Sequence, residues 1–322
     1  MKDLSFRKVV LVPGYQCNNR CVFCINTGKR ALPPRASAEM RLEIKAAAAR
    51  GCNYLEFAGG ENTIRPDFCA LVRCARKAGF KKIAVATNGR MFSYPAFAEA
   101  ALAAGLTEII FSIHGHNAAL HDGLTGVPGS FLQLLRGIEN IRKLFKGTVA
   151  TNTAITRRNF RSLPEIGAFI DGFGFRNSEF IYADPTYGGV KDNFAELMPR
   201  ISECAPYMRA CLDLAAGWPA EGGLKQFGYN WSVRYVPLCY FREYYPYQVS
   251  EAREVLLYSN VQHVAPDYVN LDAIKGRREL GRSKPAKCLR CALYNECEGI
   301  WREYLAVYGD GELKPLKKRP RR

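Results

Sequence analysis

The sequence predicts an α/β fold built on a parallel sheet, and three observations support this prediction. The chain has 322 residues, 48% of them hydrophobic, which is enough for one large domain or a core with an appendage. Amphipathic stretches alternate with short apolar, β-branched runs, and such alternation requires parallel strands joined by right-handed crossovers. Both a partial barrel and a doubly wound sheet fit this pattern, and each would place its site at the carboxyl ends of the strands. The six predicted strands cover residues 9–12, 54–58, 83–87, 108–113, 148–155 and 179–183.

The predicted helices have recognisable ends. Ser37 is the expected N-cap of the first helix, and Gly51 follows its last residue. The second helix lies between Pro66 and Gly79, the usual placement of these two residues at helix ends. The expected helices cover residues 39–50, 67–78, 95–104, 131–146 and 163–171.

The pattern changes after about residue 184. A loop is expected at residues 185–193 and a longer helix, carrying Cys204 and Cys211, at residues 196–216. The rest of the chain lacks the strand–helix period and suggests a smaller, loop-rich appendage. We therefore expect three regions: a core over residues 1–195, a C-terminal region over residues 196–313, and a disordered basic tail over residues 314–322.

The formal net charge of +16 is open to several interpretations. The tail contributes six basic residues and no acid, so residues 1–313 keep a charge of +10. Such a surplus could attract RNA, an acidic peptide or a phosphorylated substrate, or it could be an ordinary solvated surface. Binding of a nucleic acid is supported by no sequence motif.

The hydropathy pattern indicates a cytoplasmic protein without a membrane partner. No apolar run approaches the roughly 18 residues of a membrane span, and only four apolar residues follow the polar start, so a signal peptide is not expected. Thiols stay reduced in the cytoplasm. The 12 cysteines therefore favour metal binding or catalysis over disulfides.

Cys17, Cys21 and Cys24 form a C-x3-C-x2-C run directly after the first predicted strand. A [4Fe–4S] cluster normally takes four cysteines, so three in one loop would leave one iron open to an outside ligand. The alternatives are a zinc site completed by a distant residue and three incidental thiols.

This loop resembles the signature of the radical S-adenosylmethionine superfamily, and further motifs over residues 7–185 extend the resemblance. They are Gly59-Gly60-Glu61 after the second strand, Thr87-Asn88-Gly89-Arg90 after the third, Phe111-Ser112-Ile113-His114-Gly115 on the fourth and Thr151-Asn152-Thr153 on the fifth. The resemblance implies a partial (β/α)6, TIM-like barrel with a catalytic [4Fe–4S] cluster on the three cysteines. It also implies S-adenosylmethionine contacts from Gly59, Gly60, Glu61, Asn88, Ser112, His114 and Asn152.

The reaction that the resemblance implies begins with reductive cleavage of S-adenosylmethionine. An electron donor such as flavodoxin or ferredoxin would reduce the cluster, and the resulting 5′-deoxyadenosyl radical would abstract a hydrogen atom from the substrate. We expect Gly59 and Gly60 to let the backbone approach the ligand. Glu61 would face the ammonium group of the ligand, or it would be a solvated loop carboxylate.

Three of the four histidines, His114, His116 and His121, lie close together in the sequence. A metal site or an acid–base pair is conceivable there. We favour a position lining the cofactor pocket for His114 and structural roles for the other two.

A second cysteine group lies near the C-terminus. Cys288, Cys291 and Cys297 have C-x2-C-x5-C spacing, and Cys239 lies upstream among aromatic residues. Four thiolates can hold a second [4Fe–4S] cluster or a structural zinc ion. The spacing resembles the SPASM and twitch subgroup of the same superfamily, and the number of cysteines favours the twitch pattern with one auxiliary cluster.

The remaining cysteines are expected in the core. Cys204 and Cys211 lie two helical turns apart and either supplement the auxiliary site or pack as small apolar residues. Cys52, Cys69 and Cys74 are interpreted as core residues. The aromatic block at residues 235–247 would line a substrate channel, stack on bases or pack around the auxiliary site.

The resemblance leaves the substrate open. Maturation of a peptide is the leading expectation. Dehydrogenation, epimerisation or carbon–carbon bond formation on a carbohydrate, nucleoside or other small metabolite is the main alternative, and modification of RNA is a third. The alternative without enzyme activity is a cysteine-rich metal protein that binds nucleic acid.

Overall fold

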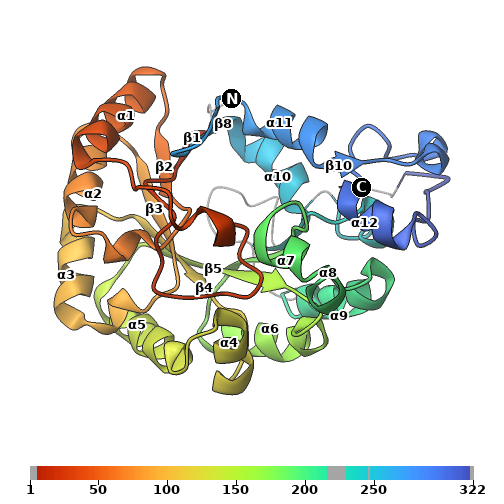
Figure 1. Cartoon of the computed structure of the whole chain (residues 1–322), viewed down its shortest axis with the longest axis horizontal. Helices are drawn as coiled ribbons and strands as arrows, with labels where there is room; N and C mark the ends of the chain where they lie inside the picture. The colour runs from red at the N-terminus through yellow and green to blue at the C-terminus, as the bar shows by residue number, and fades with distance from the viewer. Residues whose placement is uncertain (1–5, 216–229, 246, 320–322) are drawn as a thin grey trace.

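A parallel sheet forms the centre of the computed structural model, which describes residues 6–215, 230–245 and 247–319 (Figure 1). Nine strands lie in the order β7-β6-β5-β4-β3-β2-β1-β8-β9. All six predicted strands are present, in sequential order and paired in parallel. They are β1 (Phe6–Leu11), β2 (Tyr54–Phe57), β3 (Lys82–Thr87), β4 (Glu108–Ser112), β5 (Thr148–Ile155) and β6 (Asn177–Tyr182).

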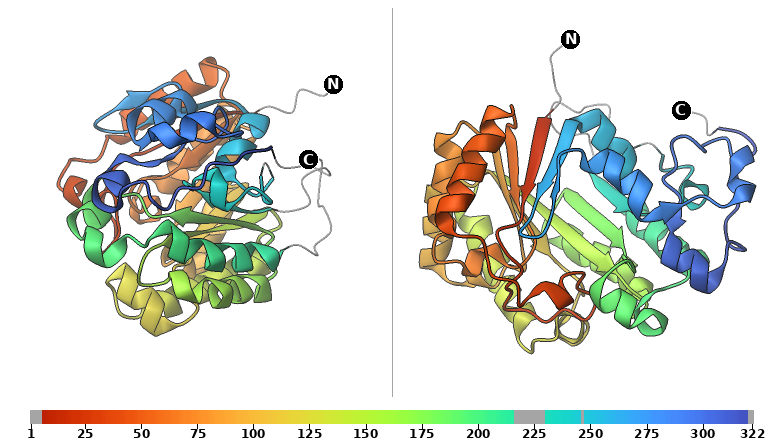
Figure 2. Two further views of the ribbon diagram at one scale, coloured as in Figure 1. Left: turned by 90° about the vertical axis from the view of Figure 1, so that its right-hand side faces the viewer. Right: turned by 45° about the horizontal axis from the view of Figure 1, so that its top comes forward.

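The crossover helices cover the outer face of this curved sheet, as a partial barrel requires (Figure 2). Alternate strand residues such as Val9, Leu55 and Val85 are fully buried against these helices and form the main core with them. Val10, on the other face of β1, belongs to a separate small cluster. The helices are α1 (Ser37–Ala49), α2 (Phe68–Lys77), α3 (Pro95–Ala104), α4 (Ala118–Thr125), α5 (Ser130–Leu144) and α6 (Leu163–Gly172).

The C-terminal region extends both edges of the sheet, which corrects the expectation of a loop-rich appendage. β7 (Trp231–Arg234) pairs in parallel with β6, and β8 (Tyr258–Val264) pairs in parallel with β1. A short β9 (Val269–Asn270) runs antiparallel to β8. Within the described residues, the sheet thus runs from β7 to β9 without closing.

The long helix expected at residues 196–216 is two helices in the structure. α8 (Phe194–Leu197) ends before Pro199, and α9 (Ile201–Asp213) begins after it, because a proline disfavours helical backbone in the preceding residue. The predicted loop at residues 185–193 contains a short helix, α7 (Gly188–Asp192).

The end of the chain packs on the core. The remaining elements are α10 (Ser250–Leu257), α11 (Ala273–Leu280), β10 (Arg282–Ser283), β11 (Ile300–Trp301) and α12 (Arg302–Tyr308). Tyr304 is fully buried, and its hydroxyl accepts the Ile201 N–H at 3.0 Å, which fixes α12 on α9. The tail expected to be disordered is described as far as Arg319, whose guanidinium pairs with Glu296 at 2.7 Å. Its last three residues lie outside the described part of the chain. None of the described helices is both long and apolar enough to cross a bilayer.

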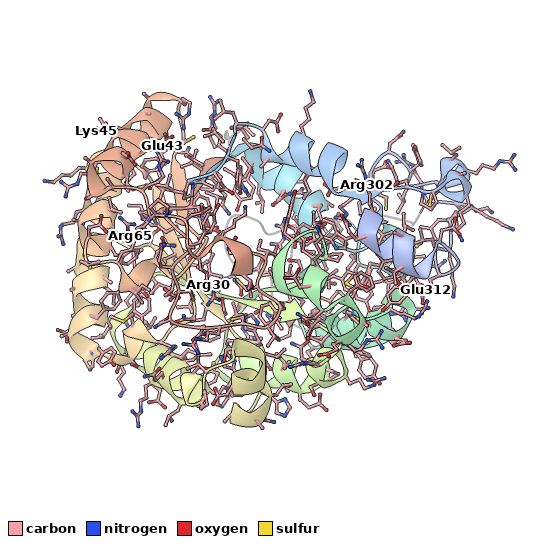
Figure 3. All side chains as sticks on the ribbon, in the orientation of Figure 1. Arg30, Glu43, Lys45, Arg65, Arg302 and Glu312 are labelled. Atoms are coloured by element: carbon pink, nitrogen blue, oxygen red, sulfur yellow. The ribbon has the colours of Figure 1, made fainter. Side chains whose placement is uncertain are left out.

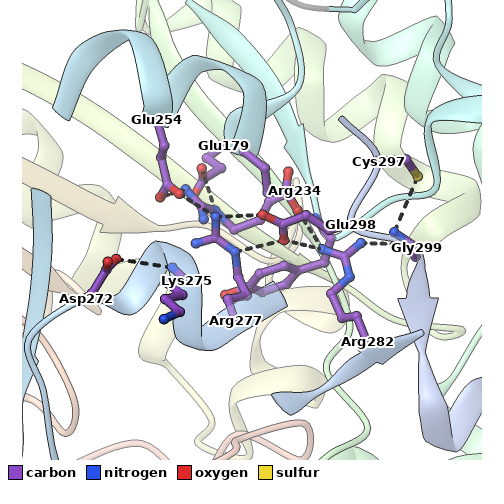
Figure 4. A network of polar contacts seen from close by, with 12 residues as sticks. Glu179, Arg234, Glu254, Asp272, Lys275, Arg277, Arg282, Cys297, Glu298 and Gly299 are labelled. Atoms are coloured by element: carbon purple, nitrogen blue, oxygen red, sulfur yellow. Dashed lines mark hydrogen bonds and ion pairs between the residues drawn. The ribbon is translucent and has the colours of Figure 1, made fainter. Parts of the chain in front are cut away.

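A buried network of ion pairs joins the C-terminal region to the sheet (Figure 4). Arg234 on β7 contacts Glu179 on β6 at 2.8 Å and Glu254 on α10 at 2.7 Å. Arg277 on α11 contacts Glu254 at 2.7 Å and Glu298 at 2.9 Å. Each charge therefore has a partner of opposite sign, which compensates the cost of removing it from water.

Replacement of Arg282, whose side chain is fully buried, tests this network. The guanidinium contacts Glu251 at 2.8 Å and Glu298 at 3.3 Å. Arg282→Met removes a partner from these buried carboxylates and is expected to lower the free energy of unfolding by about 3–5 kcal/mol in urea titrations. Arg242→Met breaks an exposed pair with Glu243 and should change it by less than about 0.5 kcal/mol. Equal effects of the two substitutions would contradict the structural role of the network.

Candidate active site at the carboxyl ends of the strands

The loop with the first three cysteines follows β1 and lies at the carboxyl edge of the sheet. α4 supports it, because Arg20 and Val22 donate their N–H groups to Thr125 and Leu124 at 2.8 and 3.0 Å. Figure 3 shows the side chain of Arg30 beside this loop.

The structure brings Cys17, Cys21 and Cys24 close together. Burial raises the pKa of Cys21 to about 12, and the neighbouring Cys24 and Cys17 thiols add to this effect. Burial also raises the pKa of Cys17, while the charge of Arg30 opposes the rise. Three neighbouring thiols of this kind would lose their protons to a bound metal centre, which supplies the missing positive charge.

The Gly59-Gly60 turn packs directly on the start of the cysteine loop. The Gly60 N–H donates to the Gly14 carbonyl at 2.9 Å. A Cβ atom on Gly60 would lie 2.3 Å from the Gln16 carbonyl oxygen, and one on Gly59, at φ +103°, would lie 2.3 Å from the Val12 side chain. The close approach that requires glycine is thus an approach of the backbone to the protein's own cysteine loop. Contact of these glycines with a ligand stays a prediction.

Glu61 is 3% exposed, which excludes the alternative of a solvated carboxylate. Its oxygens accept the Thr87 hydroxyl at 2.9 Å, the Asn88 N–H at 2.7 Å and both the hydroxyl and the N–H of Thr63. Burial raises the pKa of Glu61, and these hydrogen bonds oppose the rise. In this structure Glu61 therefore joins the turn after β2 to the end of β3.

Asn88 and Arg90, after β3, hold the residues that follow Cys17. The Asn88 amide donates to Asn18 Oδ1 at 2.7 Å. Arg90 donates to the Asn18 carbonyl and, at 2.9 Å, to Asn19 Oδ1. The end of β3 thus fixes the path of the loop between Cys17 and Cys21.

Gly188 and Gly189 at the start of α7 are contacts that the sequence analysis missed. The Gly189 N–H donates to the Cys24 carbonyl at 3.0 Å. A Cβ atom on Gly189 would lie 2.0 Å from the Val22 carbonyl oxygen, and one on Gly188 would lie 2.3 Å from that of Cys24. The sequence feature that could have indicated this contact is a second glycine pair after a predicted strand, like Gly59-Gly60 after β2.

Asp267, in the turn between β8 and β9, also holds the cysteine loop and was also missed. It accepts the Tyr15 hydroxyl and pairs with Lys29 Nζ at 2.7 Å. Lys29 ends the turn η1 (Thr27–Lys29) after Cys24. Its ammonium lies 5.3, 5.9 and 5.6 Å from the ring centres of Tyr15, Tyr187 and Tyr268, within the range of cation–π attraction.

The inner face of the sheet forms the wall of the site. Ser112 at the end of β4 stands in register with Asn152 on β5, and both are partly exposed although their strands are central. At the amino ends of the strands, an ion pair of Lys8 and Glu56 (2.6 Å) lies on the same inner face. The wall is therefore partly exposed at the carboxyl ends of these two strands and charged at its opposite end.

His114 lies between the cysteine loop and β5. Its ring meets Phe23 edge-on at 4.7 Å between centres, and its Nδ1 accepts the Ala154 N–H at 3.2 Å. In the neutral ring the proton is then on Nε2. His121 Nδ1 accepts the backbone N–H of His114 at 3.3 Å, which is consistent with the structural role predicted for His121.

All four predicted auxiliary cysteines, Cys239, Cys288, Cys291 and Cys297, line one mostly apolar pocket in the C-terminal region. Leu238 and Gly299 donate their N–H groups to Cys297 Sγ at 3.5 and 3.3 Å. Burial raises the pKa of Cys239 to about 11, with contributions from the other three thiols.

Both cysteine sets fit an iron–sulfur cluster by their donor chemistry. No group of three or more histidine, cysteine, aspartate or glutamate side chains in the described residues is arranged to hold a metal ion. The cysteines of a cluster bind different irons and need not converge on a common ion. Backbone N–H groups directed at sulfur are the usual second layer of such sites.

The remaining cysteines pack in the core, as the sequence analysis favoured. Cys204 and Cys211 on α9 are fully buried, and a Cβ atom on Gly167 of α6 would lie 2.7 Å from the Cys211 sulfur. Cys52 is buried, and Cys69 and Cys74 are partly buried against the same core. In the aromatic block, Phe241 is fully buried, and the Tyr240 and Tyr244 hydroxyls donate to the Glu312 carbonyl and to Asp213 at 2.7 and 2.8 Å.

Gly189→Ala tests the contact of α7 with the cysteine loop. The added methyl group meets a backbone oxygen that cannot move alone, so we expect the free energy of unfolding to fall by about 1–3 kcal/mol. In metal-free protein, Cys21 and Cys24 should also react faster with a thiol reagent. The control is Gly123→Ala, where nothing lies within 4 Å and stability should stay the same or rise. Unchanged thiol reactivity in Gly189→Ala would count against the contact.

The buried histidines predict sensitivity to acid. Burial lowers the pKa of His114 to about 3 and that of His121 to about 4, so the unfolded chain binds more protons below pH 6.5. The contribution of these two histidines to the free energy of unfolding should be complete above pH 6.5 and should decrease as the pH drops toward 4. His121→Asn keeps an acceptor for the His114 N–H and should reduce the slope of unfolding free energy against pH by up to about 1.4 kcal/mol per unit. Urea titrations of metal-free protein between pH 5 and 7 measure it, and an unchanged slope would refute the assignment.

Comparison with known proteins places these features in a family. The model of the Radical SAM superfamily matches residues 11–170. The AdoMet-dependent heme synthase of Methanosarcina barkeri is 34% identical over 149 residues, 46% of this chain and 42% of that protein. The mycofactocin maturase MftC of Mycobacterium tuberculosis is 30% identical over 161 residues, 50% of this chain and 40% of that protein. The chain thus matches less than half the length of these relatives.

Solved structures share the fold at low sequence identity. Streptococcus suis SuiB bound to S-adenosylmethionine superposes with a TM-score of 0.60 at 15% identity, over 98% of this chain and 77% of that one. Native anSMEcpe with bound AdoMet and Kp18Cys peptide gives 0.53 at 16% identity, over 65% and 60% of the two chains. The family model, the relatives and the cysteine loop after β1 agree, and the chain belongs to the Radical SAM superfamily.

Proposed function

We propose that the chain is a radical S-adenosylmethionine enzyme. The observation that carries the proposal is the loop of Cys17, Cys21 and Cys24, which is held at the carboxyl edge of a partial barrel. These cysteines would hold a [4Fe–4S] cluster with one iron free for S-adenosylmethionine. When bound and reduced, the cluster would cleave S-adenosylmethionine and supply the 5′-deoxyadenosyl radical that abstracts a substrate hydrogen atom.

The chain's own residues would bind and orient the cofactor. The turn of Gly59 and Gly60 presents its backbone next to the cysteine loop, and Glu61 fixes this turn to Asn88. Ser112, Asn152 and the Nε2–H of His114 would contribute polar contacts along the inner wall.

The four cysteines of the C-terminal pocket would hold a second, auxiliary [4Fe–4S] cluster. Support comes from their convergence on one pocket and from the N–H groups that donate to Cys297. An electron donor such as flavodoxin or ferredoxin would reduce the catalytic cluster.

A peptide is the substrate class that we propose first. Structural neighbours include SuiB bound to precursor peptide SuiA, which superposes over 99% of this chain with a TM-score of 0.59, and one relative is named a maturase. The second candidate is a small metabolite, because a probable GTP 3′,8-cyclase of Saccharolobus solfataricus is 30% identical over 146 residues.

Iron analysis after anaerobic reconstitution tests the two clusters. We expect about eight irons per chain, and about four in a Cys17/Cys21/Cys24→Ala variant or in a Cys239/Cys288/Cys291/Cys297→Ala variant. With S-adenosylmethionine and a strong reductant, the wild type and the variant without the auxiliary cysteines should form 5′-deoxyadenosine. The variant without Cys17, Cys21 and Cys24 should not. Zinc in place of iron, or no 5′-deoxyadenosine from the wild type, would contradict the proposal.

Deuterium transfer distinguishes the substrate classes. Candidate peptides and nucleotides with deuterated carbons are incubated with the reduced enzyme, and the 5′-deoxyadenosine is examined by mass spectrometry. A deuterated product identifies both the substrate and the carbon that is attacked. Transfer from a nucleotide and from none of the peptides would favour the second candidate.

A further inference from the structure

Residues 313–316, at the start of the basic tail, lie against the auxiliary cysteines. The Leu316 N–H donates to Cys291 Sγ at 3.4 Å. The Leu316 carbonyl accepts the N–H of Ala292, the next residue after Cys291, at 2.8 Å. This pair of bonds fixes the tail segment to the backbone of the C-x2-C turn.

The same segment reaches a second cysteine and covers the pocket. The backbone of Lys314 hydrogen-bonds to Cys239 and opposes the rise of its pKa. Leu313, which is 6% exposed, and Pro315 line the pocket together with the four cysteines. Four consecutive residues therefore join cysteines that are more than fifty positions apart in the sequence and shield them from water.

Contacts of Glu312, directly before the segment, hold it in place. Before it, the Tyr240 hydroxyl donates to the Glu312 carbonyl at 2.7 Å, and the Tyr304 hydroxyl donates to the Glu312 carboxylate. After it, Arg319 pairs with Glu296 at 2.7 Å, but the Arg319 side chain is exposed, and such a pair contributes little. The contacts of Glu312 and the Leu316–Ala292 hydrogen bond therefore keep the N–H groups of the segment directed at the sulfurs.

We propose that residues 313–316 are a strap of the auxiliary cluster, whose N–H groups bind the ligating sulfurs and whose apolar side chains exclude water. The inference rests on the proposed auxiliary [4Fe–4S] cluster. Hydrogen bonds to sulfur and exclusion of solvent both set the potential and stability of such clusters, because the reduced form carries more negative charge. The basic residues after Leu316 have no part in this role.

Leu316→Pro tests the strap without a change of charge or length. Proline has no N–H group, so Cys291 loses its donor, whereas Leu316→Ala removes the side chain and keeps the donor. Both substitutions are made in the Cys17/Cys21/Cys24→Ala variant, where only the auxiliary site holds iron. Loss of iron to a chelator and the midpoint potential, from an EPR-monitored titration, are measured.

We expect Leu316→Pro to lose iron about tenfold faster than Leu316→Ala, the order of effect for losing an outer partner of a metal ligand. Its midpoint potential should fall, since the reduced cluster loses a donor. If Leu316→Pro does not fold, removal of residues 314–322 takes its place, with removal of residues 317–322 as the control that keeps Leu316. The control should hold iron as firmly as the parent.

Two results would overturn the inference. Equal rates and potentials for Leu316→Pro and Leu316→Ala would show that the N–H group of Leu316 has no such role. Faster loss of iron after removal of residues 317–322 alone would assign the effect to the basic residues. A parent variant that takes up no iron would instead refute the proposed auxiliary cluster, so the two failures are distinguishable.

Discussion

Backbone packing against the cysteine loop is the constraint on which the candidate active site depends. Two glycine pairs, Gly59-Gly60 after β2 and Gly188-Gly189 at the start of α7, contact the loop where no side chain has room. Such a backbone contact restricts the position of the loop more than a contact through a long side chain would, because backbone atoms move only together with their whole segment. Three thiols on a mobile loop would sample many separations. On this loop they are held at one edge of the sheet.

The buried charges hold the auxiliary cysteines in a different way. Arg282 donates to the Gly299 carbonyl at 2.8 Å, and the N–H of Gly299 donates to Cys297 Sγ at 3.3 Å (Figure 4). Through Arg277 and Glu254 the same network continues to β7 and β6. The position of Cys297 therefore depends on ion pairs whose other members lie on the central sheet, so the C-terminal region and the core cannot be treated as independent units.

Local patterns predicted the parts of this structure that local forces determine. Strands β1 to β6 and both cysteine sets follow from apolar runs and from spacing, which neighbouring residues largely decide. Strands β7 and β8 were missed because residues such as Arg234 and His263 interrupt their apolar pattern. Those residues are tolerated there since the inner face supplies partners such as Glu179, which are distant in the sequence. Gly189 and Asp267 were missed for the same reason, because the cysteine loop that they contact is distant from them in the sequence.

The C-terminal region contacts both cysteine sets, and its elements join them. Asp267 fixes the flanks of the catalytic loop through Tyr15 and Lys29. The chain then passes through β9 into α11, where Arg277 pairs with Glu298, the neighbour of Cys297. Asp267 and Arg277 are thus only ten positions apart, although one holds the flanks of the catalytic loop and the other pairs with the neighbour of Cys297. Arg277 lies within α11, so β9 and the first turn of this helix connect the residue that holds the catalytic loop to the residue that pairs beside Cys297.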